Sequence, residues 1–368
     1  MEKYRLLEDV CEILDSQRIP ITASERKAGG YPYYGANGIQ DYVDNYIFDD
    51  DLVLLAEDGG NFGSRDKPIA YRVSGKCWVN NHAHVLKPKS TINVDYLCYT
   101  LMFYDTTGLV NGATRQKLTQ SAMRQMKIPF VKMDVQNEIV KKINLVVDLI
   151  GKRKKQLEKF DELVKSRFIE MFGDGNHPHI ALIDLIIEGA GLSYGIVQPG
   201  DDGTGDMGVL RPVDMVDGKI STASIKYIDR SIGDGFKKTE LYGDELLITV
   251  RGTTGITALT DIRFNGMNVT RGIAVVRYDR NKINPVYLNA YLNTDESQRY
   301  IQEHTRGATL QQINLSDLRV QQIMVPPLAL QEQMAAFIEQ TDKSKFEIKQ
   351  SLEKLEVLKK ALMQKYFG

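Results

Sequence analysis

The stretch Gly112-Ala113-Thr114-Arg115-Gln116-Lys117 returns about 195 residues later as Gly307-Ala308-Thr309-Leu310-Gln311-Gln312. The same offset relates three further pairs: Gln136 and Gln331, Leu157-Glu158-Lys159 and Leu352-Glu353-Lys354, and Phe172-Gly173 and Phe367-Gly368. A repeat of this length is far longer than the periods of solenoids or propellers, so it predicts a duplicated domain together with a duplicated helix. A protein with two similar halves is expected to recognise a ligand that also has two halves.

Composition is that of a soluble globular protein, and 368 residues leave room for two core-forming domains. No stretch approaches 18 consecutive apolar residues, and the N-terminus lacks the apolar segment of a signal peptide. Three cysteines, Cys11, Cys77 and Cys98, form no CxxC pair, which suits reduced thiols. We therefore expect a cytoplasmic protein. A net charge of −1 does not by itself suggest DNA binding.

Two long helices are predicted, roughly over 134–172 and 329–367, because their apolar residues recur mostly at spacings of three, four or seven. Each follows a proline-marked junction, Ile128-Pro129 or Val325-Pro326-Pro327. Such helices are not stable alone in water, since helix stability comes mostly from packing of the apolar face. The apolar stripes of the two helices match, so we expect the helices to pair antiparallel with one another, related by a pseudo-two-fold axis. The alternative is that each helix packs on its own domain or on another subunit.

The remaining segments predict an α+β fold with mixed α/β globular heads. Short apolar runs at 52–55 and 246–250 indicate buried strands, and each leads into a glycine-containing loop, at 57–63 and 251–255. Matching helices are expected to open near 92–97 and 283–288. The expected domains are a first head at 1–132, a first helical region at 133–173, a second head at 174–327 and a second helical region at 328–368.

Catalytic motifs are missing from the sequence. It contains no GxxxxGK[ST] loop for a nucleotide. Phe172-Gly173-Asp174-Gly175 is a weak match to a methyl-donor loop, and Asn284-Pro285-Val286-Tyr287 lacks the second proline of a flipped-adenine site, so a helix cap or turn explains both better. We predict no catalytic residue, no cofactor site and no metal site in this chain.

A pair of histidines is the one feature of the sequence that could indicate a metal site. In His82-Ala83-His84, residues two apart on a strand would face the same way, but no third ligand is suggested nearby. The basic run at 152–155 suits the solvated face of a paired helix better than a DNA contact.

The repeated Gly-Ala-Thr-x-Gln loops are the strongest candidates for DNA contact. Glutamine can pair with adenine, and Arg or Lys with guanine, in a major groove. Alternatively, each glycine takes a positive φ and the Thr and Gln cap the next helix; a loop can do both. The candidate contacts are Arg65, Lys67, Arg115, Gln116, Lys117, Arg251, Arg271, Gln311 and Gln312.

Taken together, the chain resembles the specificity subunit of type I restriction–modification systems over essentially its whole length. The resemblance rests on the order of the features, given twice: the segments 31–38 and 244–255, the Gly-Ala-Thr-x-Gln loops, the proline junctions, Gln136 and Gln331, and the long helices ending in Phe-Gly. It implies two target recognition domains that each read half of a split sequence in double-stranded DNA. It also implies an antiparallel coiled coil that sets the gap between the halves.

The resemblance further implies partner subunits that perform the chemistry. Modification subunits, usually two, would bring S-adenosylmethionine for adenine methylation, and restriction subunits would bring ATP- and Mg-dependent translocation and cleavage. Because the family's recognition domains vary widely, no base-contacting residue is carried over. Two alternatives are a fused enzyme that itself methylates DNA, and a scaffold or decoy that acts only through protein partners.

Overall fold

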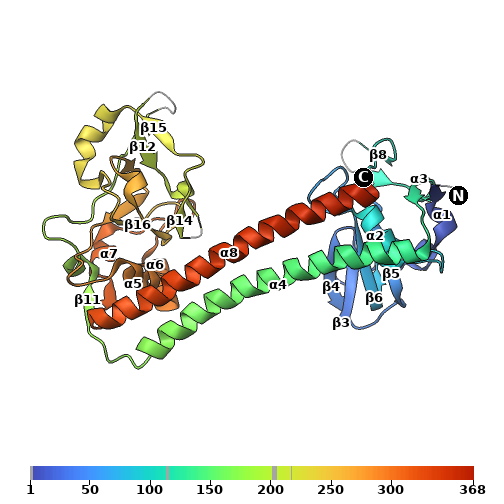
Figure 1. The fold of residues 1–368 in the computed structure, drawn as a ribbon, viewed down its shortest axis with the longest axis horizontal. Helices are drawn as coiled ribbons and strands as arrows, with labels where there is room; N and C mark the ends of the chain where they lie inside the picture. Colours follow the sequence, from blue (N-terminus) through green and yellow to red (C-terminus); the bar gives the residue numbers. More distant parts are fainter. Residues whose placement is uncertain (1–2, 113–115, 201–204, 217) are drawn as a thin grey trace. The chain divides into compact units, whose positions relative to one another are not determined.

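The computed structural model describes residues 3–112, 116–200, 205–216 and 218–368 (Figure 1). The chain divides into two compact units. Unit 1 comprises Met1–Lys154 and Lys349–Gly368, and unit 2 comprises Lys155–Ile348. The two long helices, α4 (Met133–Phe172) and α8 (Leu328–Phe367), each contribute one part to each unit.

Unit 1 is built on a six-stranded sheet in the order β2 (Cys11–Ile13), β7 (Ala83–Pro88), β5 (Phe48–Ala56), β6 (Ala70–Val79), β3 (Ala28–Gly35) and β4 (Gly38–Val43). Only β3 and β6 are parallel neighbours in this sheet. The predicted strand at 52–55 lies within β5. Its side chains enter two different apolar clusters in alternation, Leu52 and Leu54 in one and Val53 and Leu55 in the other. Because both faces of the strand are buried, its sequence is a continuous apolar run. Helix α2 packs against β5 and β6 (Figure 1).

In chain order, the elements of the unit 1 head are β1 (Tyr4–Leu6), α1 (Leu7–Val10), β2 (Cys11–Ile13), the 3₁₀ helix η1 (Asp15–Gln17), β3 (Ala28–Gly35), β4 (Gly38–Val43), β5 (Phe48–Ala56), β6 (Ala70–Val79), β7 (Ala83–Pro88), α2 (Val94–Met102), β8 (Val110–Asn111), β9 (Lys117–Leu118), α3 (Gln120–Arg124) and β10 (Lys127–Pro129).

Unit 2 has smaller sheets, centred on the order β17-β16-β19. Its strand β16 repeats the pattern of β5, since Leu246 and Ile248 enter one apolar cluster and Leu247 another. The elements of its head are β11 (His179–Ala181), η2 (Leu182–Leu185), β12 (Met207–Leu210), η3 (Pro212–Asp214), β13 (Met215–Val216), β14 (Lys219–Ile220), β15 (Lys226–Ile228), η4 (Arg230–Thr239), β16 (Leu246–Thr249), β17 (Thr257–Leu259), η5 (Ile262–Phe264), β18 (Asn268–Val269), β19 (Ile273–Val276), α5 (Pro285–Leu292), α6 (Asp295–His304), α7 (Leu315–Val320) and β20 (Gln322–Met324).

A buried glutamine fixes the start of each long helix. In unit 1, Gln136 accepts a hydrogen bond at Oε1 from the backbone N–H of Asn93 (2.8 Å) and donates from Nε2 to the carbonyl of Val131 (2.8 Å). In unit 2, Gln331 accepts from the N–H of Asn284 (2.8 Å) and donates to the carbonyl of Pro326 (2.7 Å). Each helix start is therefore tied to the N-cap asparagine of α2 or α5, which explains why both glutamines recur.

The phenylalanine that ends each long helix packs on the same helix of a head. Phe172, at the end of α4, contacts Tyr287 of α5 in unit 2, with ring centroids 5.4 Å apart. Phe367, at the end of α8, contacts Tyr96 of α2 in unit 1, with centroids 5.2 Å apart. Thus α4 begins in unit 1 and ends in unit 2, whereas α8 begins in unit 2 and ends in unit 1.

Within each unit, the two helix segments also contact one another. In unit 1, Lys154 of α4 pairs with Glu356 of α8 (3.5 Å). In unit 2, Asp161 of α4 pairs with Lys345 of α8 (2.6 Å), and the Arg167 guanidinium lies over the ring of Phe337. Among the described residues, no helix is both long and apolar enough to cross a bilayer.

Candidate nucleic-acid interface

In unit 1, the glycine loop that follows β5 lies against the end of the first repeated loop. The backbone N–H of Gly59 donates to the carbonyl of Gln116 (3.3 Å), and the N–H of Leu118 donates to the carbonyl of Glu57 (2.7 Å). Between these two bonds, Asp58 and Lys117 face one another as an antiparallel bridge. Two loops about 58 residues apart in sequence therefore form one surface.

Unit 2 forms the same contact with different side chains. The N–H of Gly252 donates to the carbonyl of Gln311 (2.8 Å), and the N–H of Ile313 donates to the carbonyl of Val250 (3.0 Å). Between these bonds, Arg251 and Gln312 form the bridge. The predicted glycine loop and the predicted repeated loop thus meet in each unit through the same pair of backbone hydrogen bonds, which we call the backbone clamp.

In the repeated loops, the predicted glycine conformation is confirmed, but the predicted helix caps are not. Gly112 and Gly307 adopt φ of 103° and 100°, which confirms the expected positive φ. Among the described residues, the expected capping by the loop's own Thr and Gln is wrong. Thr119 accepts from the N–H of Ala122 and caps α3, and Asn314 occupies the N-cap of α7 without a side-chain cap bond. Gln116 and Gln311 are exposed instead. Arg115 lies outside the described residues.

The other candidate residues lie around the clamp. Arg65 and Lys67 are exposed in the loop between β5 and β6. Lys67 lines an open groove of about 620 Å³, together with Asn37, whose amide donates to the carbonyl of Gly59 (3.0 Å). Arg271 is exposed and precedes Gly272, whose carbonyl accepts from the N–H of Val250 (2.7 Å), so Arg271 flanks the strand that leads to Arg251.

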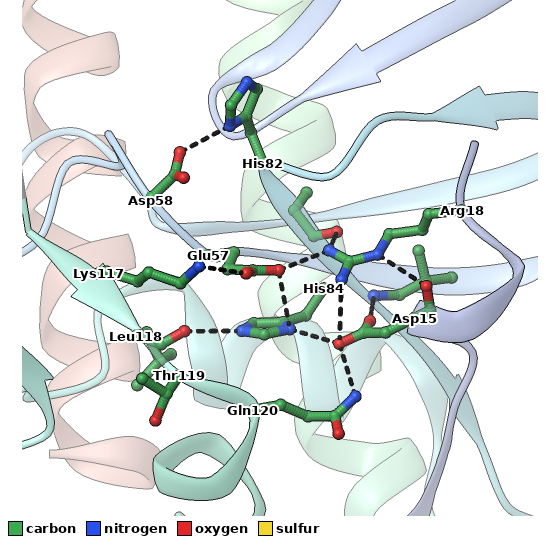
Figure 2. A network of polar contacts seen from close by, with 12 residues as sticks. Asp15, Arg18, Glu57, Asp58, His82, His84, Lys117, Leu118, Thr119 and Gln120 are labelled. Carbon is green, nitrogen blue, oxygen red and sulfur yellow. Dashed lines mark hydrogen bonds and ion pairs between the residues drawn. The ribbon is translucent and has the colours of Figure 1, made fainter. Parts of the chain in front are cut away.

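A network of charged side chains lies beneath the clamp of unit 1 (Figure 2). The Lys117 ammonium binds Oε1 of Glu57 (3.0 Å), and Arg18 binds Oε2 of the same carboxylate (2.6 Å). Asp15 binds Nδ1 of His84 (2.6 Å) and accepts from the amide of Gln120 (3.0 Å). The network therefore joins η1, β7 and the residue that follows β5 to the segment after the repeated loop.

His84 is the centre of this network and is fully buried. Its Nδ1 faces the Asp15 carboxylate, and its Nε2 lies 2.9 Å from the carbonyl oxygen of Leu118. The carbonyl oxygen of Leu118 can only accept, so Nε2 donates to it. Nδ1 is hydrogen-bonded to Asp15, which also accepts from the N–H of Val85 (2.8 Å).

The charges of the network shift the acidity of its carboxyl groups. Burial alone would raise the pKa of Asp15, but the hydrogen bond and charge of His84 outweigh it, and the pKa lies below its ordinary value. Burial likewise opposes ionisation of Glu57, yet the hydrogen bonds from Arg18 and Lys117 lower its pKa. Both groups are therefore held as carboxylates at neutral pH.

The donor atoms of Asp15, Glu57 and His84 lie within 4.8 Å of one another, close enough to hold a metal ion. The arrangement does not favour one, because Arg18 already pairs with both carboxylates and both ring nitrogens of His84 already have hydrogen-bond partners within the protein. His82 lies just before β7 and its ring binds Asp58 (2.7 Å), so the two histidines serve different partners and do not form the common strand face expected from sequence.

Unit 2 supports its clamp with apolar side chains. Val250 stands where unit 1 has Glu57, and Ile313 stands where it has Leu118, since these residues make the equivalent backbone bonds. Both are fully buried. The clamp is thus common to the two units, whereas its support is ionic in one and apolar in the other.

Sequence reasoning missed Asp15, Arg18 and the role of His84. Asp15 and His84 are 69 positions apart and belong to different elements, so no local spacing connects them. The two weak matches to methyltransferase motifs have structural roles. Asn284 caps α5 by accepting from the N–H groups of Val286 and Tyr287, and Phe172 is buried against Tyr287.

Comparison with known proteins gives consistent matches. A family model described as the type I restriction modification DNA specificity domain matches residues 2–159 and again 206–360. A Haemophilus influenzae chain assigned as a type I restriction enzyme specificity subunit is 28% identical over 363 residues, which cover 92% of this chain and 86% of the relative.

Two solved structures share the fold. The crystal structure of a type I restriction–modification S subunit from M. genitalium matches with a TM-score of 0.60 at 14% identity, over 99% of this chain and 96% of that chain. A structure solved in a study of complex assembly and conformational transition of the type I R-M system matches with a TM-score of 0.52 at 15% identity, over 99% and 97% of the chains.

Proposed function

Because the chain belongs to the type I restriction–modification DNA specificity family, we propose that it selects the DNA sequence on which a type I complex acts. Each recognition domain reads one half of a bipartite target in double-stranded DNA. The proposed domains are a recognition domain at 1–132, a helical region at 133–173, a second recognition domain at 174–327 and a second helical region at 328–368.

The observation that carries this proposal is the backbone clamp. It joins the same two loops in both units, yet it presents Asp58 and Lys117 in one and Arg251 and Gln312 in the other. A common frame with divergent polar side chains suits a protein that reads two different half-sites. A scaffold that acted only through protein partners would not require it.

We further propose that α4 and α8 pair as an antiparallel coiled coil with pseudo-two-fold related halves, which sets the gap between the half-sites. The ion pairs Lys154–Glu356 and Asp161–Lys345, each within its own unit, support this pairing. Half-site spacing on a duplex follows from protein geometry. Deleting one heptad from each helix should therefore change the number of base pairs between the methylated halves, and an unchanged gap would contradict this role.

The chemistry is proposed to reside in partner subunits. Two modification subunits would bind along the helices and bring S-adenosylmethionine for adenine methylation, and restriction subunits would bring ATP and Mg for translocation and cleavage. The chain alone is then non-catalytic. Partners that also contact phosphates would explain how a chain with a net charge of −1 can serve a DNA-binding complex.

The direct test is to sequence the methylated bases of cells that express this chain with its modification subunits. Cells with the modification subunits alone are the control. The expected result is methylation at one split sequence only when this chain is present. Equal methylation with and without the chain, or methyl transfer by the purified chain alone, would overturn the proposal.

A further inference from the structure

A third strand extends each clamp into a row of three side chains. In unit 1, Lys117 faces Asp58 on one side and Asn111 of β8 on the other. In unit 2, Gln312 faces Arg251 on one side and Arg306 on the other. We call these three residues the cross-strand row of each unit. Residues directly opposite in antiparallel strands project to the same face, so each row forms one continuous strip of side chains.

The two rows are equivalent position by position. Asn111 and Arg306 are related by the same offset as Lys117 and Gln312, and the clamp relates Asp58 to Arg251. Backbone bonds hold the rows in place: in unit 2, the N–H groups of Arg306 and Gln312 donate to one another's carbonyls, both at 2.8 Å. Because the frame is made by the main chain, side chains in the row can differ without loss of the frame.

The row of unit 2 consists of hydrogen-bond donors suited to base edges. The Arg306 side chain is 72% exposed, and its contact with the Asp317 carboxylate is a long one of 3.9 Å. Among the described residues, no ion pair involves Arg251. Arginine donates two parallel hydrogen bonds to O6 and N7 of guanine, and glutamine pairs with N6 and N7 of adenine in the major groove. Arg251, Gln312 and Arg306 therefore form a strip that can read neighbouring purines.

The row of unit 1 has different chemistry at the same positions. Lys117 is half exposed and binds Glu57, and Asp58 binds His82. Asn111 is exposed. One ammonium, one carboxylate and one amide cannot make the base contacts of two guanidinium groups and an amide. The two units are thus expected to prefer different bases at corresponding steps of their half-sites.

We propose that the cross-strand row is the specificity-determining element of each recognition domain. In unit 2, Arg251 and Arg306 donate to guanine and Gln312 pairs with adenine; in unit 1, Lys117 is the donor to guanine and Asn111 pairs with adenine. Asn111 and Arg306 thereby join the base-reading residues. The inference deepens the proposed function and rests on it.

The test is to convert the row of unit 2 into that of unit 1 in the intact complex with modification subunits. The variants are Arg251→Asp, Arg306→Asn and Gln312→Lys, singly and together. The matched control is Arg280→Ala, because Arg280 is 63% exposed and pairs with Asp244 at the opposite end of β16 and β19. Methylated sites are sequenced, and binding to duplexes with each base at each half-site position is measured.

Each single variant should lower the preference for the favoured base at one position of one half-site by about 5- to 150-fold. The triple variant should change that half-site and leave the other intact, and the control should change neither. An unchanged half-site in the triple variant would overturn the inference while leaving the proposed function standing. Absence of any sequence preference in the parent complex would instead overturn the proposed function. If the triple variant does not fold, the inference is tested by Gln312→Lys alone, because unit 1 has a lysine, Lys117, at the equivalent position. An unchanged base preference in this variant would then overturn the inference.

Discussion

The buried ring of His84 donates from Nε2 to the carbonyl oxygen of Leu118 over 2.9 Å, and so ties the segment carrying Lys117 to the central sheet of unit 1. The other ring nitrogen is hydrogen-bonded to the buried Asp15, so this pair of side chains lies in the interior of unit 1. The presentation of an exposed lysine thus depends on a buried histidine.

Replacing His84 by leucine should destabilise unit 1 by about 1–3 kcal/mol, because Asp15 and the carbonyl of Leu118 each lose a buried hydrogen-bond partner. The only tryptophan, Trp78, lies in β6 of this unit, so its fluorescence during urea unfolding reports the effect. His82→Leu is the control, because the ring of His82 is 35% exposed. This variant should lower the free energy of unfolding by less than about 1 kcal/mol. An equal loss of unfolding free energy in the two variants would contradict a structural role of the buried His84–Asp15 pair.

Stability of unit 1 should fall in acid. The pKa values of Asp15 and Glu57 are lower in the folded protein than their ordinary values, so folding favours the ionised form. This stabilisation is complete above the ordinary pKa of each carboxyl and is lost as the pH falls through the folded-state value. The urea midpoint followed at Trp78 should therefore decrease from pH 7 to pH 3. The Asp15→Asn variant should show a shallower decrease, and a slope equal to that of the parent would contradict the assignment.

Gln136 and Gln331 should each contribute to the docking of a long helix on its head. Replacing either by alanine removes buried partners of main-chain groups and should cost about 1–3 kcal/mol. Gln136→Ala should lower the urea midpoint followed by Trp78 fluorescence, whereas Gln331→Ala should leave that midpoint unchanged. Gln331→Ala should instead lower the unfolding temperature of unit 2 in calorimetry. Gln333→Ala, two positions along α8 and exposed, is the control and should be neutral.

The three thiols should be unreactive until the protein unfolds. Cys11, Cys77 and Cys98 are buried, and burial raises the pKa of each to about 12, so almost no thiolate is present at pH 8. A colorimetric disulfide reagent should therefore label none in the native protein and all three in urea. An Ile39→Cys variant, at a position that is 49% exposed, should be labelled at once. Rapid labelling of the parent would contradict the described core.

The repeat predicted the frame of the fold well. Gln136 and Gln331 recur because each makes the same buried hydrogen bonds, and Gly112 and Gly307 recur because each turn needs a positive φ. These are local requirements of the main chain, and the same residue satisfies them in both halves. A tight offset therefore marks positions where structure constrains the residue.

The interface could be predicted only in part. The candidates Lys117, Arg251 and Gln312 belong to the cross-strand rows, but Asp58, Asn111 and Arg306 were missed. The glycine loops of the clamp are offset by two residues fewer than the repeated loops, so Asp58 and Arg251 do not align directly. Asn111 and Arg306 share the offset of the repeated loops, but they differ in residue type, and only the pairing of strands places them beside Lys117 and Gln312.

The central claim is that each head independently reads one half of a split DNA target. The most direct measurement is to replace residues 1–132 by the corresponding head of another member of the family and to sequence methylated bases in cells that carry the modification subunits. One half of the methylated sequence should change while the other half is retained. A change in both halves, or in neither while methylation persists, would contradict it.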